Sequence, residues 1–321
     1  MDDSANAHDP LRTVVVSRRA QLTDDIIELT LAPAAGKELV VAEPGAHIRV
    51  HLGGEHRAYS LCSVEPHGRT WTIAIARDRS NRGFSAMLHD RAVLGTMLEV
   101  TEPFNNFQLL QAPRYVFIAG GIGITPLLPM IETVTRDEAE WELVYVGKRR
   151  TAMAYLDQLV DRHGDAVRVH TSEQLGRLDL KDLVSQLPAD AMIYACGPDS
   201  LLDDLESVGA SWPPGRLRVE RFQGGVVHEP SDQAFPIEFA RTELQASVGP
   251  DQTVLEVAES LGIFVDVSCE EGTCGSCLTR VLAGEVDHRD FILTPEERTR
   301  SEVMYVCVSR SKHGSPLVLD L

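Results

Sequence analysis

One stretch decides much of this chain's architecture: Ser268-Cys269-Glu270-Glu271-Gly272-Thr273-Cys274-Gly275-Ser276-Cys277. Its three thiols have C-x4-C-x2-C spacing, and a fourth, Cys307, follows 30 residues after the third. This is the ligand spacing of a plant-type [2Fe–2S] cluster. A tightly curled loop supplies three thiolates and a returning strand supplies the last. The two glycines let the loop turn sharply and leave room for backbone N–H groups to face the sulfurs.

Two other kinds of thiol site compete with that interpretation, a zinc site and a disulfide pair. Zinc sites usually combine two C-x2-C pairs, whereas this stretch has one short pair and a single distant partner. The other two cysteines, Cys62 and Cys196, lie far apart in the sequence and indicate no disulfide framework. We therefore predict that the cluster ligands are Cys269, Cys274, Cys277 and Cys307.

Length and charge limit the classes of protein that the chain can belong to. Its 321 residues suffice for two to three domains, and its 43% of hydrophobic residues can fill their cores. The net charge of −18 argues against nucleic acid and anionic membranes as partners. Residues 231–321 contain 16 acidic and 7 basic residues, so this part alone carries −9. Neither a signal peptide nor an apolar run of roughly 18 residues is present, and we expect a cytoplasmic protein.

The hydrophobic pattern changes twice along the chain. Residues 1–110 alternate short β-rich runs with Gly, Pro and Asp turns, which predicts a small antiparallel barrel. Residues 111–222 alternate strands with helices, among them helices over 127–135 and 152–160, which predicts a parallel sheet. Residues 223–236 are polar, have Gly and Pro near their ends and show no periodicity, as is typical of a linker. Residues 237–321 hold the thiols and form the last predicted domain.

Two places in the barrel region combine residues with binding chemistry. The strand segment Arg57-Ala58-Tyr59-Ser60 carries an arginine, a phenol and a hydroxyl together. The turn Arg82-Gly83-Phe84-Ser85 precedes a short helix, so a cation, a backbone N–H and a hydroxyl meet at a helix start. Such a helix start is suited to an anion. Each segment alone could be simple packing or a solvated turn, and their combination favours binding.

A glycine-rich turn follows the first strand of the parallel sheet. It reads Gly120-Gly121-Ile122-Gly123-Ile124-Thr125-Pro126, and we expect Thr125 to cap the helix that follows. Glycines let a ligand approach the backbone, and the helix N-terminus favours a pyrophosphate. The turn departs from the G-x-G-x-x-G pattern because Pro126 takes the last glycine's place, so a plain strand–helix turn stays an alternative. A later strand ends in Cys196-Gly197-Pro198, at the sheet edge where ligands bind, although Cys196 could equally be a small buried residue.

These motifs together resemble the phthalate dioxygenase reductase and vanillate O-demethylase reductase family. The resemblance covers nearly all of the chain after Leu11, with further matches at Asn105-Asn106-Phe107, Glu220-Arg221-Phe222 and Asp287-His288-Arg289-Asp290. It implies a flavin-binding antiparallel barrel, a Rossmann-like nicotinamide-binding domain and a β-grasp ferredoxin domain. Members carry FMN and a [2Fe–2S] cluster, oxidise NADH and reduce Rieske-type oxygenases.

The resemblance also implies roles for individual residues. Arg57, Ala58, Tyr59 and Ser60 would hold the flavin with Ala76, and Arg82, Gly83 and Ser85 would bind its phosphate. Phe84 replaces a glycine that the family often has. Gly120, Gly121, Gly123, Thr125, Pro126 and Gly197 would line the nicotinamide site. Cys196 would line that site too, and Glu220 and Phe222 would lie near the reactive edge of the flavin.

Electron counting explains this order of cofactors. A nicotinamide delivers two electrons as a hydride, a [2Fe–2S] cluster accepts one at a time, and a flavin can mediate between them. We expect NADH to be preferred to NADPH, although Lys148-Arg149-Arg150 follows the second strand of the sheet, where a 2′-phosphate could be met. We also expect a monomer that meets its oxygenase transiently. The alternatives are an FAD-containing reductase with a fused ferredoxin and a non-catalytic iron–sulfur sensor or electron carrier.

Overall fold

The computed structural model describes residues 11–34, 38–63, 68–77, 83–222, 224, 226–267 and 269–321. The chain divides into two compact units, Met1–Glu220 and Arg221–Leu321. The predicted phosphate ligand Arg82, the first linker residue Gln223 and Ser268 of the thiol stretch lie outside the described residues. Among the described helices, none has both the length and the apolar character needed to cross a membrane.

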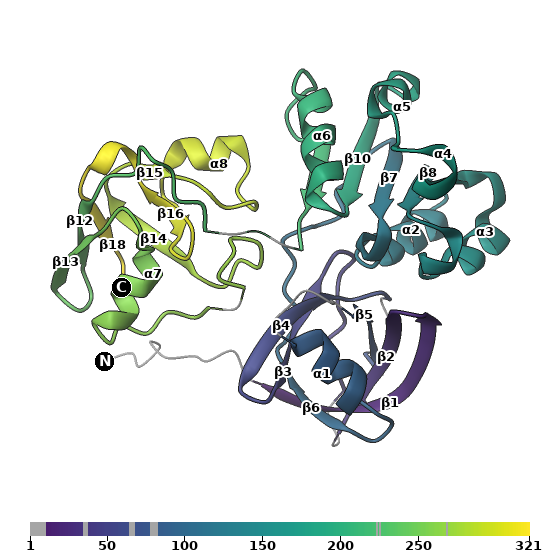
Figure 1. Ribbon diagram of the computed structural model, residues 1–321, viewed down its shortest axis with the longest axis horizontal. Helices are drawn as coiled ribbons and strands as arrows, with labels where there is room; N and C mark the ends of the chain where they lie inside the picture. Colours follow the sequence, from purple (N-terminus) through teal and green to yellow (C-terminus); the bar gives the residue numbers. More distant parts are fainter. Residues whose placement is uncertain are drawn as a thin grey trace. The chain divides into compact units, whose positions relative to one another are not determined.

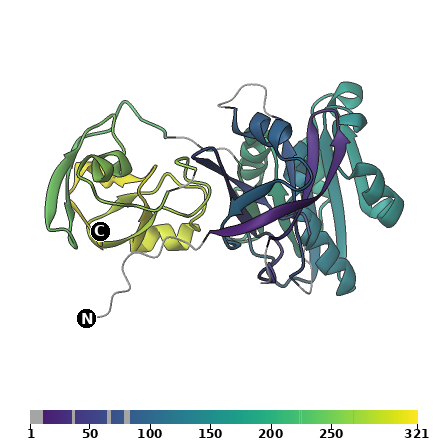
Figure 2. The ribbon, with the colours of Figure 1, turned by 90° about the horizontal axis from the view of Figure 1, so that it is seen from below.

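The first unit begins with an antiparallel barrel, purple to blue in Figure 1. Its six strands follow the order β4-β3-β6-β1-β2-β5, and a bridge between Leu61 and Ile73 joins the two ends. Figure 2 shows the long strand β1 curving along the barrel. Alternate apolar residues, such as Val14 and Val16 of β1, fill the interior. The elements are β1 (Arg12–Thr23), β2 (Ile26–Pro33), β3 (His47–Leu52), β4 (Glu55–Ser60), β5 (Trp71–Ala76), α1 (Phe84–Arg91) and β6 (Met97–Val100).

A parallel sheet with helices on both faces completes the first unit. Its strand order is β11-β10-β7-β8-β9, and every neighbouring pair is parallel. The strands are β7 (Arg114–Gly120), β8 (Glu140–Gly147), β9 (Val167–Thr171), β10 (Ala191–Cys196) and β11 (Leu217–Glu220). The helices are η1 (Gly121–Ile124), α2 (Leu127–Arg136), η2 (Arg150–Ala152), α3 (Leu156–His163), η3 (Gly164–Ala166), α4 (Ser172–Leu175), α5 (Leu180–Gln186) and α6 (Asp199–Gly209).

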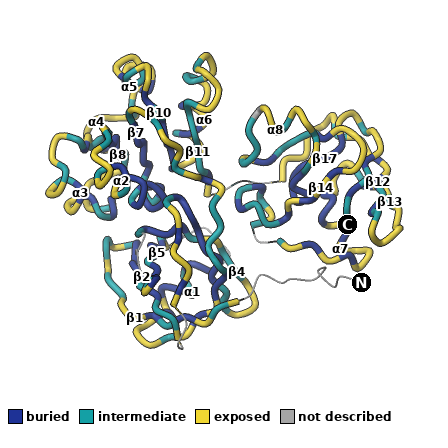
Figure 3. Tube along the Cα trace, turned by 180° about the vertical axis from the view of Figure 1, so that it is seen from behind, coloured by how far each residue is buried: buried dark blue, intermediate teal, exposed yellow. Residues whose placement is uncertain are grey.

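The central strand β7 is buried on both faces, as Figure 3 shows in dark blue. Tyr115 and Phe117 pack against the α2 and α3 side, while Val116 and Ile118 pack against α5 and α6. Because neighbouring side chains of a strand point to opposite faces, a strand covered by helices on both sides must be apolar throughout.

Three local features differ from the sequence-based expectations. Thr125 does not cap α2: its hydroxyl donates to the Ile122 carbonyl (3.0 Å), and Pro126 occupies the cap position. The helix expected over 152–160 begins only at Leu156, because Tyr155 adopts a left-handed backbone conformation (φ 60°) that interrupts it. Helix α6 follows Cys196-Gly197-Pro198 and was not expected.

The second unit is a mixed sheet covered by one main helix. Its strand order is β13-β12-β18-β14-β16, with β12 and β18 parallel and the other neighbours antiparallel. Helix α7 begins with a capping box between Thr253 and Glu256 and buries Val254 and Val257 in the core. The elements are β12 (Phe235–Phe239), β13 (Leu244–Val248), α7 (Val254–Ser260), β14 (Leu278–Ala283), β15 (Val286–Asp287), α8 (Pro295–Arg300), β16 (Val303–Tyr305), β17 (Arg310–Ser311), η4 (Lys312–Gly314) and β18 (Leu317–Leu319).

Part of the segment predicted as a linker is bound to the second unit. Strand β12 begins at Phe235, inside the predicted range, and the carboxylate of Asp232 is buried against the guanidinium of Arg289. Arg289 also donates to the Val227 carbonyl (2.6 Å). Its hydrogen bonds lower the pKa of Asp232 to about 2. The motif Asp287-His288-Arg289-Asp290 therefore anchors this segment.

Candidate electron-transfer sites

The thiol loop of the second unit is shaped by residues with positive φ. Gly272 (φ 74°), Gly275 (φ 86°) and Glu270 (φ 58°) all adopt left-handed backbone conformations. A side chain at Gly272 would also collide with Val308, whose Cγ2 lies 2.7 Å from the position of a Cβ. Glycine is therefore required there both for its backbone conformation and for close packing.

The four predicted ligands lie as two pairs. Cys277 Sγ and Cys307 Sγ are 3.1 Å apart, and the side chains of Cys269 and Cys274 are hydrogen-bonded to each other. A [2Fe–2S] cluster held by four cysteines has two irons, each bound by two thiolates. Three of these thiols come from the loop, and Cys307 comes from the turn after β16 (Val303–Tyr305), where a strand was expected. The two thiol pairs fit the requirement of a two-iron cluster.

Backbone N–H groups surround the first thiol of the loop. Those of Glu271 and Thr273 donate to Cys269 Sγ at 3.3 and 3.4 Å. The hydrogen bond from Cys274 and these N–H groups lower the pKa of Cys269 to about 4, against the effect of burial, while the same hydrogen bond and burial raise the pKa of Cys274. The thiolate is the form that binds iron, so within this pair the loop favours the ionised form at Cys269.

In the barrel, Arg57 and Tyr59 of β4 share a side with the first residue of helix α1. The Arg57 guanidinium lies 5.8 Å from the centroid of the Phe84 ring, and the Tyr59 ring stacks on it at 6.5 Å. Burial raises the pKa of Tyr59, so its hydroxyl stays protonated and able to donate. Ala58 between them is exposed, and Ala76 ends the strand β5.

Phe84, where the family often has glycine, points into the barrel core and is only 1% exposed. The preceding Gly83 (φ 86°) takes the cap position of α1, and a Cβ there would meet no atom within 4 Å. In the part of the chain that the structure describes, the N-cap Gly83 supplies no side-chain cap and no acidic residue lies in the first turn, while Ser85 is buried there. The helix start keeps the shape and polarity of an anion site despite the phenylalanine.

The glycines after β7 serve two purposes. A Cβ on Gly123 would lie 2.2 Å from the Cys196 carbonyl oxygen, and one on Gly120 would lie 2.6 Å from Pro198. A Cβ on Gly197 would in turn lie 2.8 Å from the Cα of Gly120, too close for a side chain. These three glycines therefore let the turns after β7 and β10 pack together. Gly121 differs, because its φ is 56° and a Cβ there would meet nothing within 4 Å, which leaves it accessible to a ligand.

Three residues from separate motifs meet at the carboxyl edge of the sheet. Cys196 of β10 and Glu220 of β11 are register partners, and Ser60 of the barrel strand β4 forms a hydrogen bond to Glu220. The Oε2 atom of Glu220 is buried without a hydrogen-bond partner among the described residues. Burial raises the pKa of Glu220 to about 8, and the Ser60 bond offsets part of this shift. Burial and the nearby Glu220 also raise the pKa of Cys196 well above its usual value.

The second oxygen of this buried carboxyl has no hydrogen-bond partner among the described residues, which indicates a place for a ligand at the strand end, because such atoms are otherwise satisfied in folded proteins. A flavin edge and a nicotinamide fit this group of residues. Phe222, 39% exposed, belongs to the second unit, and its role at the flavin remains a prediction.

Comparisons with known proteins agree with this arrangement. A family model described as a 2Fe-2S iron-sulfur cluster binding domain matches residues 237–312. The crystal structure of phthalate dioxygenase reductase is 30% identical with a TM-score of 0.71, and the match covers 98% of each chain. The chain belongs to the phthalate dioxygenase reductase family. Tetrachlorobenzoquinone reductase of Sphingobium chlorophenolicum is 37% identical over 97% of this chain and 99% of the relative.

The family also extends into longer proteins. An intact type IV self-sufficient cytochrome P450 monooxygenase is 40% identical with a TM-score of 0.90, over 97% of this chain and 41% of that one. Membership confirms the predicted fold class of barrel, Rossmann-like domain and ferredoxin domain. This family member is an electron-transferring oxidoreductase that binds a flavin, a nicotinamide nucleotide and a [2Fe–2S] cluster.

Sequence reasoning missed two residues that hold the backbone or side chains of these sites in place by hydrogen bonds. Tyr145 of β8 donates its hydroxyl to the Gly121 carbonyl (3.1 Å), and Asp232 holds Arg289. Tyr145 lies in an ordinary apolar strand pattern, so no sequence signal distinguishes it from a core residue. Asp232 lies in a polar segment whose partner is distant in the sequence.

Proposed function

We propose that this reductase oxidises NADH, passes the electrons through bound FMN to its [2Fe–2S] cluster, and delivers them singly to a Rieske-type oxygenase. The observation that carries the proposal is the meeting of Ser60, Cys196 and Glu220 at the carboxyl edge of the sheet, beside the accessible Gly121. Family membership supports the oxygenase as the acceptor, since phthalate dioxygenase reductase is named for one.

When bound, the flavin supplies the conversion of a two-electron hydride into single electrons. The barrel residues would bind and orient it: Arg57, Tyr59 and Ser60 from β4, with Ala58 between them and Ala76 at the end of β5. Gly83 and Ser85 at the start of α1 hold the phosphate, together with Arg82. One helix start suits one phosphate group, which favours FMN over FAD.

Glu220 holds a proton at the reactive edge. With a pKa near 8 its carboxyl is largely protonated at neutral pH, so it can donate a hydrogen bond where an ionised carboxylate could not. Ser60 orients that carboxyl, and the neutral thiol of Cys196 keeps the neighbouring strand end free of charge. Gly120, Gly123, Thr125, Pro126 and Gly197 shape the nicotinamide site around Gly121.

In the second unit, the Cys269 and Cys274 pair would hold one iron, and the Cys277 and Cys307 pair the other. The N–H donors of Glu271 and Thr273 would tune the potential of the first iron, because hydrogen bonds to thiolates raise it.

NADH is the proposed donor. At the turn after β8, Lys148 pairs with Glu173 and Arg150 with Asp157, each at 3.8 Å. Two of the three cations that could meet a 2′-phosphate are thus already engaged, although surface pairs of this kind are weak. We therefore expect a kcat/KM for NADH at least about tenfold above that for NADPH, a difference near 1.4 kcal/mol.

The decisive experiment mixes the anaerobic holoprotein with NADH and then with candidate acceptors. We expect NADH to bleach the flavin, the cluster signal to appear in electron paramagnetic resonance, and a Rieske oxygenase to be reduced. Flavin that stays oxidised with both nicotinamides would refute the proposal. The 40% identity to a P450 fusion gives haem as a second candidate acceptor, so a P450 haem domain belongs in the same assay.

Gel filtration tests the proposed monomer, and fractionation of the source cells tests the proposed cytoplasmic location.

A further inference from the structure

Within the first unit, the barrel and the parallel-sheet domain share a small apolar contact. Ile26 and Ala74 of the barrel pack with Ala154 and with the partly buried Ile122 and Leu128. Apolar contacts are non-directional, so this patch alone would allow the two domains to slide against each other. Where one domain carries the flavin and the other the nicotinamide, such sliding would change the distance between the reacting rings.

A directional contact stands beside that patch. The Tyr155 hydroxyl, from the turn before α3, donates to Oε2 of Glu28 in barrel strand β2 at 2.9 Å. Glu28 is only 8% exposed and also pairs with Arg18 at 3.1 Å. The Cys62 thiol shares a hydrogen bond with the same Tyr155 hydroxyl. The carboxylate therefore faces the other domain in a buried setting.

The backbone at Tyr155 is arranged for this contact. Its φ of 60° and ψ of 3° place a bulky aromatic residue in the left-handed region, which such residues rarely adopt. This conformation delays the start of α3 to Leu156 and directs the side chain to the barrel. Backbone outliers that persist in a folded protein are held by their surroundings, and they concentrate at functional places.

A second tyrosine connects this turn to the nicotinamide site. The fully buried Tyr145 hydroxyl lies within hydrogen-bond distance of two carbonyl oxygens, that of Gly121 (3.1 Å) and that of Ala154 (3.0 Å). Ala154 immediately precedes Tyr155. A continuous series of contacts thus runs from the accessible glycine of the nicotinamide turn, through Tyr145 and residues 154–155, to Glu28 of the barrel.

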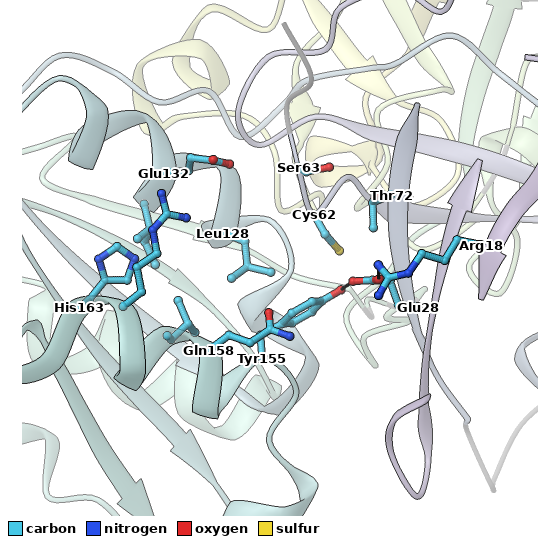
Figure 4. A pocket seen from close by; sticks show the side chains of 13 residues that line it. Arg18, Glu28, Cys62, Ser63, Thr72, Leu128, Glu132, Tyr155, Gln158 and His163 are labelled. Carbon is cyan, nitrogen blue, oxygen red and sulfur yellow. Dashed lines mark hydrogen bonds and ion pairs between the residues drawn. The ribbon is translucent and has the colours of Figure 1, made fainter. Parts of the chain in front are cut away.

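A cavity of about 260 Å³ borders this contact. Figure 4 shows the Tyr155 ring extending along its wall toward Glu28, with Leu128, Gln158 and His163 of helices α2 and α3 around the same space. Because this cavity lies between the helices and the barrel, their close packing is limited to the apolar patch and fixes their spacing less firmly here. The Tyr155–Glu28 hydrogen bond spans the two domains at its edge.

We propose that Tyr155 is a positioning residue for hydride transfer. Its hydrogen bond to Glu28 fixes residues 154–155 to the barrel, and the contacts of Tyr145 with Ala154 and Gly121 connect these residues to the nicotinamide turn. Together they hold the nicotinamide turn at a fixed distance from the flavin barrel. This rests on the proposed function. Hydride transfer requires the reacting atoms to be close, and a displacement of about 1 Å caused by a remote mutation can cost a hundredfold in rate.

The test compares Tyr155→Phe with Tyr115→Phe. Tyr115 is a matched control in the same domain, because its part-buried hydroxyl is likewise hydrogen-bonded, in its case to two backbone groups, Ala112 N and Leu110 O, at 2.9 and 3.0 Å. It lies near the start of β7, opposite the glycine-rich turn at the strand's end. Both variants lose one part-buried hydroxyl, so a general loss of stability should affect them alike.

Two measurements separate positioning from stability. Tyr155→Phe should slow anaerobic flavin reduction by saturating NADH about tenfold and leave the apparent Kd of NADH within about twofold. In addition, Tyr155→Phe should speed amide hydrogen exchange of residues 120–125, measured without nucleotide. Tyr115→Phe should change neither. Equal flavin reduction in the two variants, or equal exchange of the turn, would overturn the proposal.

Variants of Glu28 keep the proposal testable if Tyr155→Phe folds poorly. Glu28→Gln retains an acceptor for the hydroxyl and should keep most of the hydride-transfer rate, whereas Glu28→Leu should slow it as Tyr155→Phe does. The double variant Tyr155→Phe/Glu28→Leu should be no slower than either single variant, because both remove one contact. Additive losses would contradict the proposed contact. If NADH fails to reduce the wild-type flavin, the proposed function fails, but the exchange comparison still decides whether Tyr155 holds the turn.

Discussion

Cys196 and Glu220 lie directly opposite each other at the ends of the parallel strands β10 and β11. The pair places a thiol and a carboxyl side by side at the sheet edge, and Ser60 of the barrel completes the group with a hydrogen bond to Glu220. Because burial disfavours ionised forms, both the thiol and the carboxyl hold their protons more tightly than they would in water.

Glu220 should make the stability of the first unit depend on pH. Its folded pKa of about 8 lies above the ordinary 4.5, so the folded state retains a proton that the unfolded chain releases. Stability should therefore fall as pH rises from 4.5 to 8. Glu220→Gln removes this dependence and should gain about 4 kcal/mol relative to wild type at pH 8 and little at pH 4.5. Thermal melts at the two pH values measure this, and parallel curves for both proteins would contradict the raised pKa.

Removing one predicted cluster ligand should affect the second unit alone. Cys274→Ser breaks the Cys269 and Cys274 pair, and the iron–sulfur absorbance should disappear while the flavin stays bound and NADH still reduces it. Cys62→Ser is the control, since burial raises the pKa of this barrel thiol to about 12 and no cluster role is assigned to it. Loss of cluster absorbance in the Cys62 variant would show that the ligand assignment is wrong.

The flavin released from the protein by heat should be FMN. We propose one anion site at the start of α1, with Gly83 as cap and the buried Ser85 in the first turn, and one such site would match one phosphate. Chromatography of the released flavin against FMN and FAD standards gives the answer, with one FMN per chain expected. Recovery of FAD would favour the alternative reductase class.

The acidic rim of the thiol loop, Glu270 and Glu271, should steer the acceptor. The Gly224 N–H contacts the Glu271 carboxylate at 3.4 Å, whereas Glu270 is exposed, so Glu270 is the cleaner residue to change. Glu270→Lys should slow reduction of the oxygenase several-fold at low salt, and added salt should slow the wild type similarly, because screening lengths fall to about 8 Å at physiological ionic strength.

The control for that experiment is Glu243→Lys, which makes the same charge change at the exposed turn between β12 and β13. It should slow oxygenase reduction much less, and flavin reduction by NADH should change little in either variant. If oxygenase reduction were indifferent to salt and to Glu270→Lys, the rim would serve only solubility.

Much of the fold could be predicted because it rests on local patterns. The C-x4-C-x2-C spacing, the alternation of β1 and β2 and the continuous apolar run of β7 each identify an element without its neighbours. Prediction was weaker where a distant partner decides the local conformation. Tyr155 interrupts the helix expected over 152–160, and Asp232 binds Arg289 within a segment predicted to be a linker.

The sequence by itself determined the family, the order of the three domains and the thiols available to a cluster, since spacing along the chain limits which residues one loop can bring together. Only the tertiary structure decided what each residue contacts. It separated Gly121, which is open to a ligand, from Gly120, Gly123 and Gly197, which allow two turns to pack. It also joined Tyr155 to Glu28 across 127 residues, because the energy of a hydrogen bond depends on distance and burial in the folded chain and not on separation in sequence.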